Sequence, residues 1–400
     1  MYSVTLFEKE PELGGHARTI DVSVGNKTFP VDVGFMVFNP PQYPNFTHVL
    51  NLLGVETRKT NMSFSVSVDD GAVEFSGAFP FGIFADWKNM FRPRFLFFLM
   101  DIFRFNAVAR RALREDTIGD DAVGVFLDRH GFKTFFRHHY LYPMAGSIWS
   151  GSFGNIAEFP AQMLFEFLEQ HHLLEVRNKP AWHAIVGGSR EYVRRVVDDI
   201  AHAGGVLQTS AAVSGVSRHQ NGCTVTVNGD DQDFDFCILA THADTSLALL
   251  RDPDGLEAEV LKPFRYSDNH IVVHSDPSNM PRRAAAWASW NFCCPSNGRA
   301  EHVYLTYRIN SLQHIDPAYP VFITLNPTKH IDSALVHLRF STTHPIFTNE
   351  TKHAQAKLNS IQGARHTYYC GAWTRYGFHE DGLVSAIKVA ELLGASVPWK

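Results

Sequence analysis

The feature that most limits the fold of this chain is a strand-and-helix pattern that returns at three separated places. Strand and helix signals follow one another in residues 1–75, again in 180–260 and once more in 350–400. Strands that alternate with helices typically form a parallel sheet with helices packed on it. The sequence therefore predicts an α/β protein in which these three segments form one discontinuous, Rossmann-like nucleotide-binding domain.

The segments between these three have a different character. Residues from about 80 to 174 form long, aromatic-rich helical patterns, and residues 270–343 form a second block of strands. We therefore predict an α+β substrate domain, built from 76–179 and 261–349, that is interleaved with the nucleotide-binding domain.

Length, charge and cysteine usage restrict the class of protein. With 400 residues and 45% hydrophobic content the chain can bury a large core, and its formal charge of -5 argues against nucleic-acid binding. No apolar run is long enough for a membrane span, and the five cysteines form no disulfide or zinc pattern. These features predict a soluble cytoplasmic protein with at most peripheral membrane association, and they leave the oligomeric state open.

The stretch FRPRFLFFLMDIFRF, residues 91–105, has the period of an amphipathic helix. The residues expected on one side are Phe95, Leu96, Leu99, Ile102 and Phe103, with arginines near the ends. This side would pack in the core, line an apolar substrate cavity or face a membrane.

The first residues suggest a nucleotide site. A strand pattern over residues 3–8 ends at Glu8, and the pair Gly14-Gly15 follows. A carboxylate at the end of such a strand can accept both hydroxyls of a ribose, and His16 and Arg18 could reach phosphate oxygens. A solvated strand end explains the same residues without a ligand.

The far end of the chain has a complementary pattern. A strand ends at Cys370-Gly371, and a helix is entered through Glu380-Asp381-Gly382. The free backbone N–H groups of a helix N-terminus can hold an electron-rich oxygen and would stabilise negative charge on a reduced flavin ring. The alternative is an ordinary helix with Asp381 as its N-cap.

Seven short runs occur in an order known from one family: LFEKEPELGGHARTIDV, VDVGFMVFN, YPMAGSIWS, WHAIVGGSREYV, LTYRINSLQ, ITLNP and CGAWTRYGFHEDGL. Through them the chain resembles the superfamily of flavin-containing amine oxidoreductases, which includes monoamine oxidases, protoporphyrinogen oxidase and carotenoid desaturases. It is most similar to the NAD/FAD-binding branch found beside cyclopropane fatty-acid synthases. The resemblance covers nearly the whole chain.

The resemblance implies that FAD is the cofactor and that particular positions hold it. Glu8 would bind the adenosine ribose, and the backbone of Val213 would meet the adenine. The positions beside the pyrophosphate would be Gly14, Gly15 and Arg18. The positions near the flavin would be Gly34 and Phe35 at the isoalloxazine, Thr241 after its buried strand, and Gly371, Asp381, Gly382 and Leu383 around the ribityl chain and pyrimidine.

The chain departs from the family pattern at its beginning. Family members open with a strand and a G-x-G-x-x-G turn ahead of the ribose carboxylate, and this sequence starts at the second strand. We therefore expect that this glycine-loop unit is missing, that upstream sequence encodes it, and that the chain as given binds FAD poorly or lacks stability.

By the same resemblance the reaction would be an oxidation by hydride transfer to flavin N5, and the phenylalanine-rich insert favours an apolar or lipid-like small-molecule substrate. The candidates for a catalytic role beside the flavin are His379, Tyr376, Trp373 and Trp149. One alternative is a truncated, cofactor-free protein that acts as a binding partner or is inactive. Another is a flavin-dependent desaturase or isomerase, which would release no hydrogen peroxide.

Two adjacent histidine pairs, His138-His139 and His171-His172, also raise the question of a metal site. Neighbouring residues on a helix point about 100° apart, so both members of a pair cannot easily reach one ion. The sequence therefore predicts no metal.

Overall fold

The structure is a computed structural model that describes residues 2–77, 81–175, 180–294 and 304–399. Within these residues, two pairs of short parallel strands form the pattern expected of a nucleotide-binding unit. β1 (Thr5–Phe7) pairs with β8 (Val206–Gln208), and β12 (Cys237–Leu239) pairs with β18 (Thr367–Tyr369). Each pair joins segments that are far apart in the sequence, and the helices around them confirm the α/β fold class.

Those helices come from all three predicted segments. An antiparallel sheet of β9 (Val213–His219), β10 (Gly222–Val227) and β11 (Asp230–Phe234) belongs to the second segment. The helices are α1 (Pro44–Leu52), α8 (Arg190–His202), α9 (Ala243–Leu249), α10 (Gly255–Leu261), α12 (Asn349–Lys357) and α13 (His379–Leu392). The sequence predicts a buried strand over residues 236–243, and this is wrong for Ile238, whose surface is 47% exposed. Among the described strands β12 has β18 as its one hydrogen-bonded neighbour, so its apolar side chains are incompletely covered.

A second, larger sheet has seven strands among the described residues, in the order β17, β13, β16, β15, β14, β5 and β6. Their bounds are β5 (Phe64–Val68), β6 (Val73–Ser76), β13 (Arg265–His274), β14 (Trp290–Cys294), β15 (Leu305–Arg308), β16 (Phe322–Leu325) and β17 (Val336–Ile346). The β5–β6 hairpin pairs with this sheet through β14. Residues 64–76 therefore belong to the same sheet as the strands of the predicted substrate domain. The sequence prediction had placed residues up to 75 in the nucleotide-binding domain.

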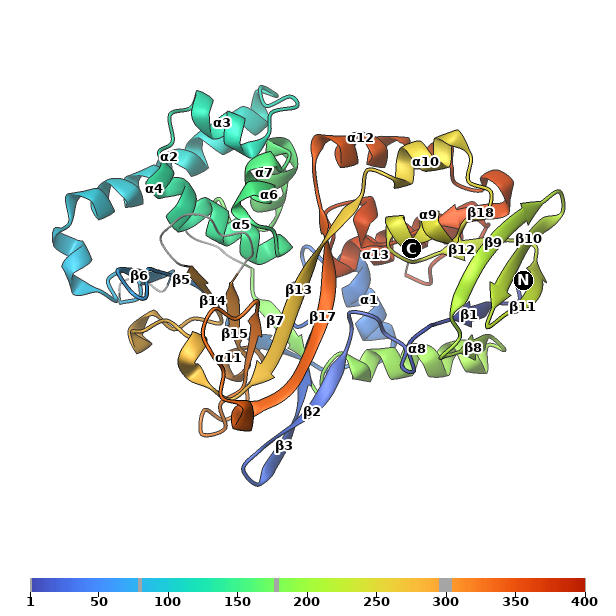
Figure 1. Ribbon diagram of the computed structural model, residues 1–400, viewed down its shortest axis with the longest axis horizontal. Coiled ribbons are helices and arrows are strands. Elements are labelled where there is room, and N and C mark those ends of the chain that lie inside the picture. Colours follow the sequence, from blue (N-terminus) through green and yellow to red (C-terminus); the bar gives the residue numbers. More distant parts are fainter. Residues whose placement is uncertain (1, 78–80, 176–179, 295–303, 400) are drawn as a thin grey trace.

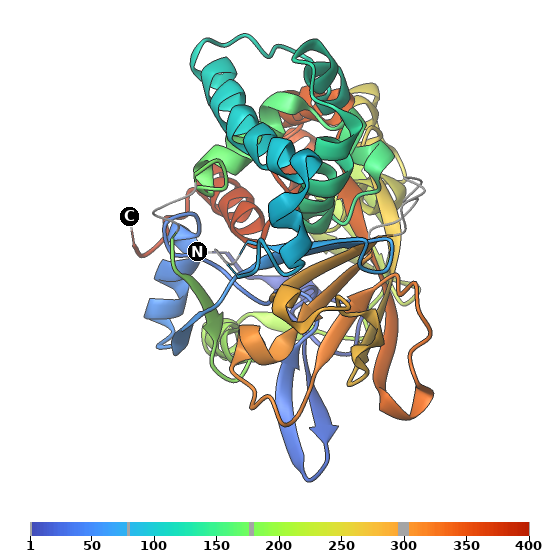
Figure 2. The same ribbon diagram turned by 90° about the vertical axis from the view of Figure 1, so that its left-hand side faces the viewer.

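Helices cover one end of this sheet, as the aromatic-rich segment predicts. They are α2 (Pro93–Arg114), α3 (Val123–Arg129), α4 (Thr134–Phe136), α5 (Tyr142–Trp149), α6 (Phe153–Glu158) and α7 (Ala161–Gln170), with the π-helical turn η2 (Arg137–Leu141) between α4 and α5. Figure 1 shows this helical layer at the opposite side of the molecule from β1 and β18, and in Figure 2 α2 runs across its outer side.

Helix α2 differs from the amphipathic helix expected from its sequence. The short 3₁₀ helix η1 (Trp87–Phe91) precedes it, and α2 itself begins at Pro93. Phe95 is buried as expected, but Leu96 and Phe103, which were placed on the same side, are exposed. The buried side of the helix carries Phe98 and Phe105 instead. Nearly every turn of α2 has apolar residues on both sides, so the hydrophobic period alone does not identify the inner face.

Two further strand pairs and a short helix connect the two regions. β2 (Thr19–Val24) pairs with β3 (Lys27–Asp32), β4 (Thr57–Thr60) pairs with β7 (Trp182–Ile185), and α11 (Ile309–Gln313) lies against them. The buried carboxylate of Asp32 joins three of these segments. It accepts hydrogen bonds from the Ser189 backbone N–H at 2.7 Å and from the Gln313 amide at 3.1 Å. Ser189 directly precedes α8, so the side chain of Asp32 links the early, middle and late parts of the chain.

Candidate functional site

The candidate site lies where the parallel strands end. Glu8 follows β1, Thr241 follows β12 by two residues, and Gly371 follows β18 by two residues. In a parallel α/β arrangement the carboxyl ends of the strands share one edge of the sheet, which is where ligands bind. The backbone carbonyl of Glu8 accepts a hydrogen bond from Ala211 N–H at 2.8 Å, which brings the start of β9 at Val213 next to it. The resemblance assigns these two positions to the ribose and the adenine of one cofactor, and these roles stay predictions.

The Gly14-Gly15 loop is held against the segment that contains Gly34. Phe35 N–H donates to the carbonyl of His16 at 2.8 Å, and Val33 N–H donates to that of Arg18 at 2.9 Å. A Cβ added at Gly34 would lie 2.1 Å from the His16 oxygen, so glycine is required there by the packing of the protein itself. Gly15 has a φ of 56°, and nothing lies within 4 Å of an added Cβ, so its backbone faces open space.

The turn that follows β18 contacts both the end of β12 and the first turns of α13. Gly371 has a φ of 150°, which only glycine adopts readily, and its N–H donates to Ser385 Oγ at 2.8 Å. The Trp373 indole donates to the carbonyl of Thr241 at 3.1 Å. The chain then turns back, so that Gly382 in the first turn of α13 lies beside Ala372, whose nitrogen would be 3.6 Å from an added Cβ.

Asp381 is the third residue of α13 and not its N-cap, which is Phe378. Its carboxylate accepts the Phe378 N–H at 3.0 Å and lies 3.5 Å from the Arg375 guanidinium. Burial raises the pKa of Asp381 to about 6. The alternative interpretation of the sequence, an ordinary helix with Asp381 as its N-cap, is therefore wrong about the cap, because the helix begins two residues earlier at His379.

His379 connects the start of α13 to the Gly34-Phe35 segment. Its ring stacks on Phe35 with centroids 4.1 Å apart, and its Nε2 shares a hydrogen bond with the Tyr192 hydroxyl at 2.9 Å. Burial lowers the pKa of His379 to about 4, so the imidazole is neutral at pH 7. Leu383 packs against the same cluster.

Three imidazoles surround the glycine loop, and sequence reasoning assigned a role to only one of them. The His16 ring lies 6.4 Å from that of His242 and 5.9 Å from that of His344. Burial lowers the pKa of all three, to about 3 for His344. Tyr266 stacks on His242 at 4.2 Å and accepts a hydrogen bond from the Ala243 N–H. More than two hundred positions separate His16 from its partners in the sequence, which therefore contains no local signal for the group.

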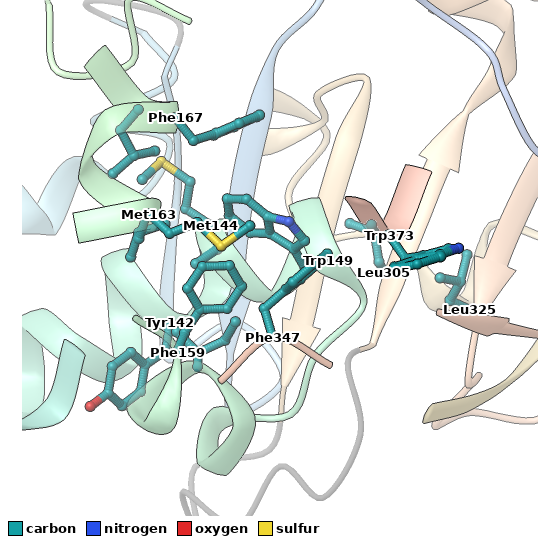
Figure 3. Close-up of a cluster of buried hydrophobic side chains, with 14 of the residues drawn as sticks. Tyr142, Met144, Trp149, Phe159, Met163, Phe167, Leu305, Leu325, Phe347 and Trp373 are labelled. Atoms are coloured by element: carbon teal, nitrogen blue, oxygen red, sulfur yellow. The ribbon is translucent and has the colours of Figure 1, made fainter. Parts of the chain in front are cut away.

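The remaining catalytic candidates lie beside an apolar cluster on α5 and α7. Figure 3 shows Met144 and Trp149 of α5 together with Met163 and Phe167 of α7. The Trp149 indole donates to the carbonyl of Tyr376 at 2.8 Å, and the Tyr376 hydroxyl donates to Glu166 at 3.1 Å. Burial raises the pKa of Tyr376 to about 12.

A cavity of about 200 Å³ adjoins this cluster, and the residues that line it are Gln162, Met163, Glu166, Lys352, Gln355, Thr374, Arg375 and Tyr376. Sequence reasoning named Tyr376 from this group and missed Glu166, which has no motif around it. The indole N–H groups of Trp149 and Trp373 thus each donate to a backbone carbonyl, whereas His379 stacks on Phe35 and shares its Nε2 hydrogen bond with Tyr192.

No group of three His, Cys, Asp or Glu side chains within the described residues could hold a metal ion. His139 Nδ1 lies 2.9 Å from the carbonyl of Phe135, and His171 Nδ1 lies 3.0 Å from that of Phe167. Each of these rings therefore contacts a backbone carbonyl four residues earlier.

Comparisons with known proteins place this geometry in context. The model of the flavin-containing amine oxidoreductase family matches residues 2–274. A comparison with curated protein sequences finds no match. Among solved structures the chain is similar to a CLA-producing fatty acid isomerase from P. acnes, with 14% identity, a TM-score of 0.65 and coverage of 97% of this chain and 92% of that one.

Two further similar structures are of proteins named for different activities. Cyclohexylamine oxidase from Brevibacterium oxydans IH-35A is 12% identical with a TM-score of 0.64, over 97% of this chain and 93% of that one. A putative protoporphyrinogen oxidase from Exiguobacterium sp. 255-15 is 13% identical with a TM-score of 0.63, over 98% and 92%. At these identities the likeness establishes a shared fold and leaves the substrate open.

Proposed function

The chain belongs to the family of flavin-containing amine oxidoreductases, and from this membership we propose that it is an FAD-dependent oxidoreductase acting on an apolar, lipid-like substrate. The observation that carries the proposal is the meeting of the Gly14-Gly15 loop, the end of β12 and the start of α13 at one edge of the parallel strands. This edge is the usual position of a nucleotide cofactor in such a fold.

The residues at this edge fit a flavin dinucleotide. Gly15 leaves its backbone open, and the half-buried Glu8 uses one carboxylate oxygen for the Glu10 N–H at 2.9 Å while the other is available to a ribose. The N-terminus of α13 begins at His379, and the backbone N–H groups of such a terminus favour an electron-rich oxygen. The Gly382 N–H itself donates to the Phe378 carbonyl at 3.1 Å. When bound, the flavin supplies the acceptor for two electrons.

The side chains beside this edge support an apolar substrate. Trp149 contacts Phe159 and Phe167, each with ring centroids 4.7 Å apart, and Phe378 adjoins the same rings. Such rings exclude water from a reacting C–H bond. The charged side chains Glu166, Lys352 and Arg375 line the cavity beside them and lie outside this apolar cluster. The neutral His379, held by Tyr192, orients Phe35 without placing a charge in the site.

Flavin binding can be tested with a matched pair of glycine variants. Gly15 and Gly54 have φ angles of 56° and 63°, and an added Cβ meets nothing within 4 Å at either position. Alanine therefore introduces a similar backbone strain, about 1 kcal/mol, in both cases. We expect Gly15→Ala to lower the FAD content of the purified protein, because the new methyl group would occupy the surface that faces the cofactor.

Gly54→Ala should retain the FAD content of the wild type. The bound flavin is measured by its visible absorbance and identified after release by chromatography. Equal FAD content in the two variants would contradict the assignment of Gly15. A wild-type protein that stays colourless when FAD is added would contradict FAD binding by the chain as given, in line with the expectation that its glycine-loop unit is missing, and would favour the cofactor-free alternative.

The reaction class can be tested with acyl substrates once flavin is bound. An oxidase releases hydrogen peroxide as the substrate is consumed, whereas an isomerase converts the substrate without peroxide and without net loss of hydrogen. We expect flavin bleaching by an apolar acyl substrate under anaerobic conditions. Bleaching by amines alone would contradict the proposed substrate class.

A further inference from the structure

The outer side of the helical layer has an unusual concentration of exposed apolar side chains. The short 3₁₀ helix η1 and helix α2 follow one another with only Arg92 between them. Between 42% and 73% of the surface is exposed for each member of what we call the outer patch, namely Trp87, Met90, Phe91, Leu96, Phe97, Met100 and Phe103. Soluble proteins rarely leave so many large apolar side chains uncovered on one surface.

The outer patch forms a continuous stripe along α2. Leu96, Met100 and Phe103 are spaced by four and three residues, which places them on one side of the helix. The opposite side carries Phe98 and Phe105, which are buried against the core. The outer residues are therefore additional to those that α2 needs for folding.

Basic side chains accompany the outer patch. Residues 86–116 contain seven arginine and lysine side chains and four carboxylates, in a chain whose formal charge is -5. Four of the basic side chains, Arg92, Arg104, Arg110 and Arg111, form ion pairs with carboxylates. Within the described residues Lys88, Arg94 and Arg114 form no ion pair with a carboxylate, and Arg94 instead lies over the Phe135 ring at 4.3 Å. These three side chains give the stretch a modest local excess of positive charge on an acidic protein.

Exposed tryptophan, phenylalanine and methionine side chains next to a basic surplus are typical of helices that lie in the interface of an anionic bilayer. We propose that the outer patch docks the protein on the surface of an anionic lipid membrane, with α2 lying in the membrane plane. None of the described helices has the length and apolar character required to cross a bilayer. The mode of binding is therefore peripheral, and it does not depend on the proposed oxidation.

A second copy of the chain is a less suitable occupant of this surface. A symmetric dimer through the outer patch would bring the same basic residues of both copies together. Like charges opposed across an interface weaken association. An anionic lipid surface provides both the apolar phase for the aromatic residues and the negative charge for the basic ones.

Vesicle co-sedimentation of the full chain tests the proposal. We expect binding to vesicles of equal parts phosphatidylcholine and phosphatidylglycerol, with affinity that falls as salt is raised, and much weaker binding to phosphatidylcholine alone. The double variant Phe97→Glu with Met100→Glu should bind the anionic vesicles at least about tenfold more weakly, because two charges would have to enter the interface.

The matched control places the same charges on apolar side chains elsewhere. Leu52 of α1 and Leu392 of α13 are 62% and 60% exposed. The double variant Leu52→Glu with Leu392→Glu should keep the wild-type affinity for vesicles. If the Phe97 and Met100 variant folds poorly, as judged by its urea midpoint, serine at both positions serves in its place.

A second pair of variants tests the basic contribution. Lys88→Glu with Arg114→Glu should weaken binding to the anionic vesicles, whereas Lys262→Glu with Lys388→Glu, at exposed positions of α10 and α13, should not. Equal vesicle binding by the Phe97 and Met100 variant and its control would overturn the proposal. So would a wild-type protein that fails to bind vesicles and forms a dimer that the Phe97 and Met100 variant abolishes.

Discussion

Asp381 shows how tertiary structure sets the chemistry of a single residue. Burial raises its pKa from 3.8 to about 6, so the folded protein holds a proton that the unfolded chain releases. Stability relative to Asp381→Asn should therefore fall as pH rises from about 4 to about 6, by on the order of 3 kcal/mol, and stay constant above that. Urea unfolding of both proteins across this range measures the difference. The neighbouring His379, whose pKa is lowered to about 4, loses its contribution as pH falls, but equally in both proteins. A difference that does not vary with pH would show that Asp381 has the same pKa in the folded and the unfolded protein.

Helix α2 shows how one element can have two apolar sides with different roles. Phe98 is 2% exposed and packs against the rings of Phe75, Phe95 and Phe135, whereas Phe97 is 65% exposed. Phe98→Ala should lower the free energy of unfolding by about 3–5 kcal/mol, because it leaves a cavity in the core. The adjacent Phe97→Ala should change it by less than about 0.5 kcal/mol. Chemical denaturation of the two single variants compares the same replacement, Phe by Ala, at a buried position and at an exposed one. Similar losses in both would mean that the outer side of α2 is also needed for folding.

At the scale of the whole molecule, Asp32 ties together segments that are far apart in the chain. Its carboxylate accepts hydrogen bonds from Thr19, Ser189 and Gln313, which belong to the early, middle and late parts of the sequence. Asp32→Ala would leave these buried donors without an acceptor. We therefore expect the free energy of unfolding to fall by about 3 kcal/mol or more. The control is Ser23→Ala, which removes an exposed hydrogen bond to Thr28 and should cost little. Calorimetry measures both, and a small loss for Asp32→Ala would mean that water replaces the missing carboxylate.

Much of the candidate site could be predicted from local sequence. Short patterns at strand ends predict the positions of Glu8, the Gly14-Gly15 loop and Gly371. A carboxylate or a glycine at the end of such a strand is typical of a nucleotide site. His242, His344 and Glu166 could not be found in this way. Their neighbours in space are remote in sequence, and nothing in their own segments distinguishes them from ordinary surface residues.

The sequence by itself determined the α/β class and the segments that carry the strand and helix signals, because hydrophobic period and glycine placement are properties of neighbouring residues. The family was indicated by the resemblance of seven short motifs and is shown by the family model that matches residues 2–274. Only the tertiary structure decided that Leu96 and Phe103 face outward while Phe98 faces inward, and that the β5–β6 hairpin joins the larger sheet through β14. It also decided that the buried His379 is neutral and that Asp381 holds a proton more tightly than usual. The physical reason is common to these cases. Burial, strand pairing and pKa depend on which distant segments come into contact, and that is settled by the free energy of the whole packed chain.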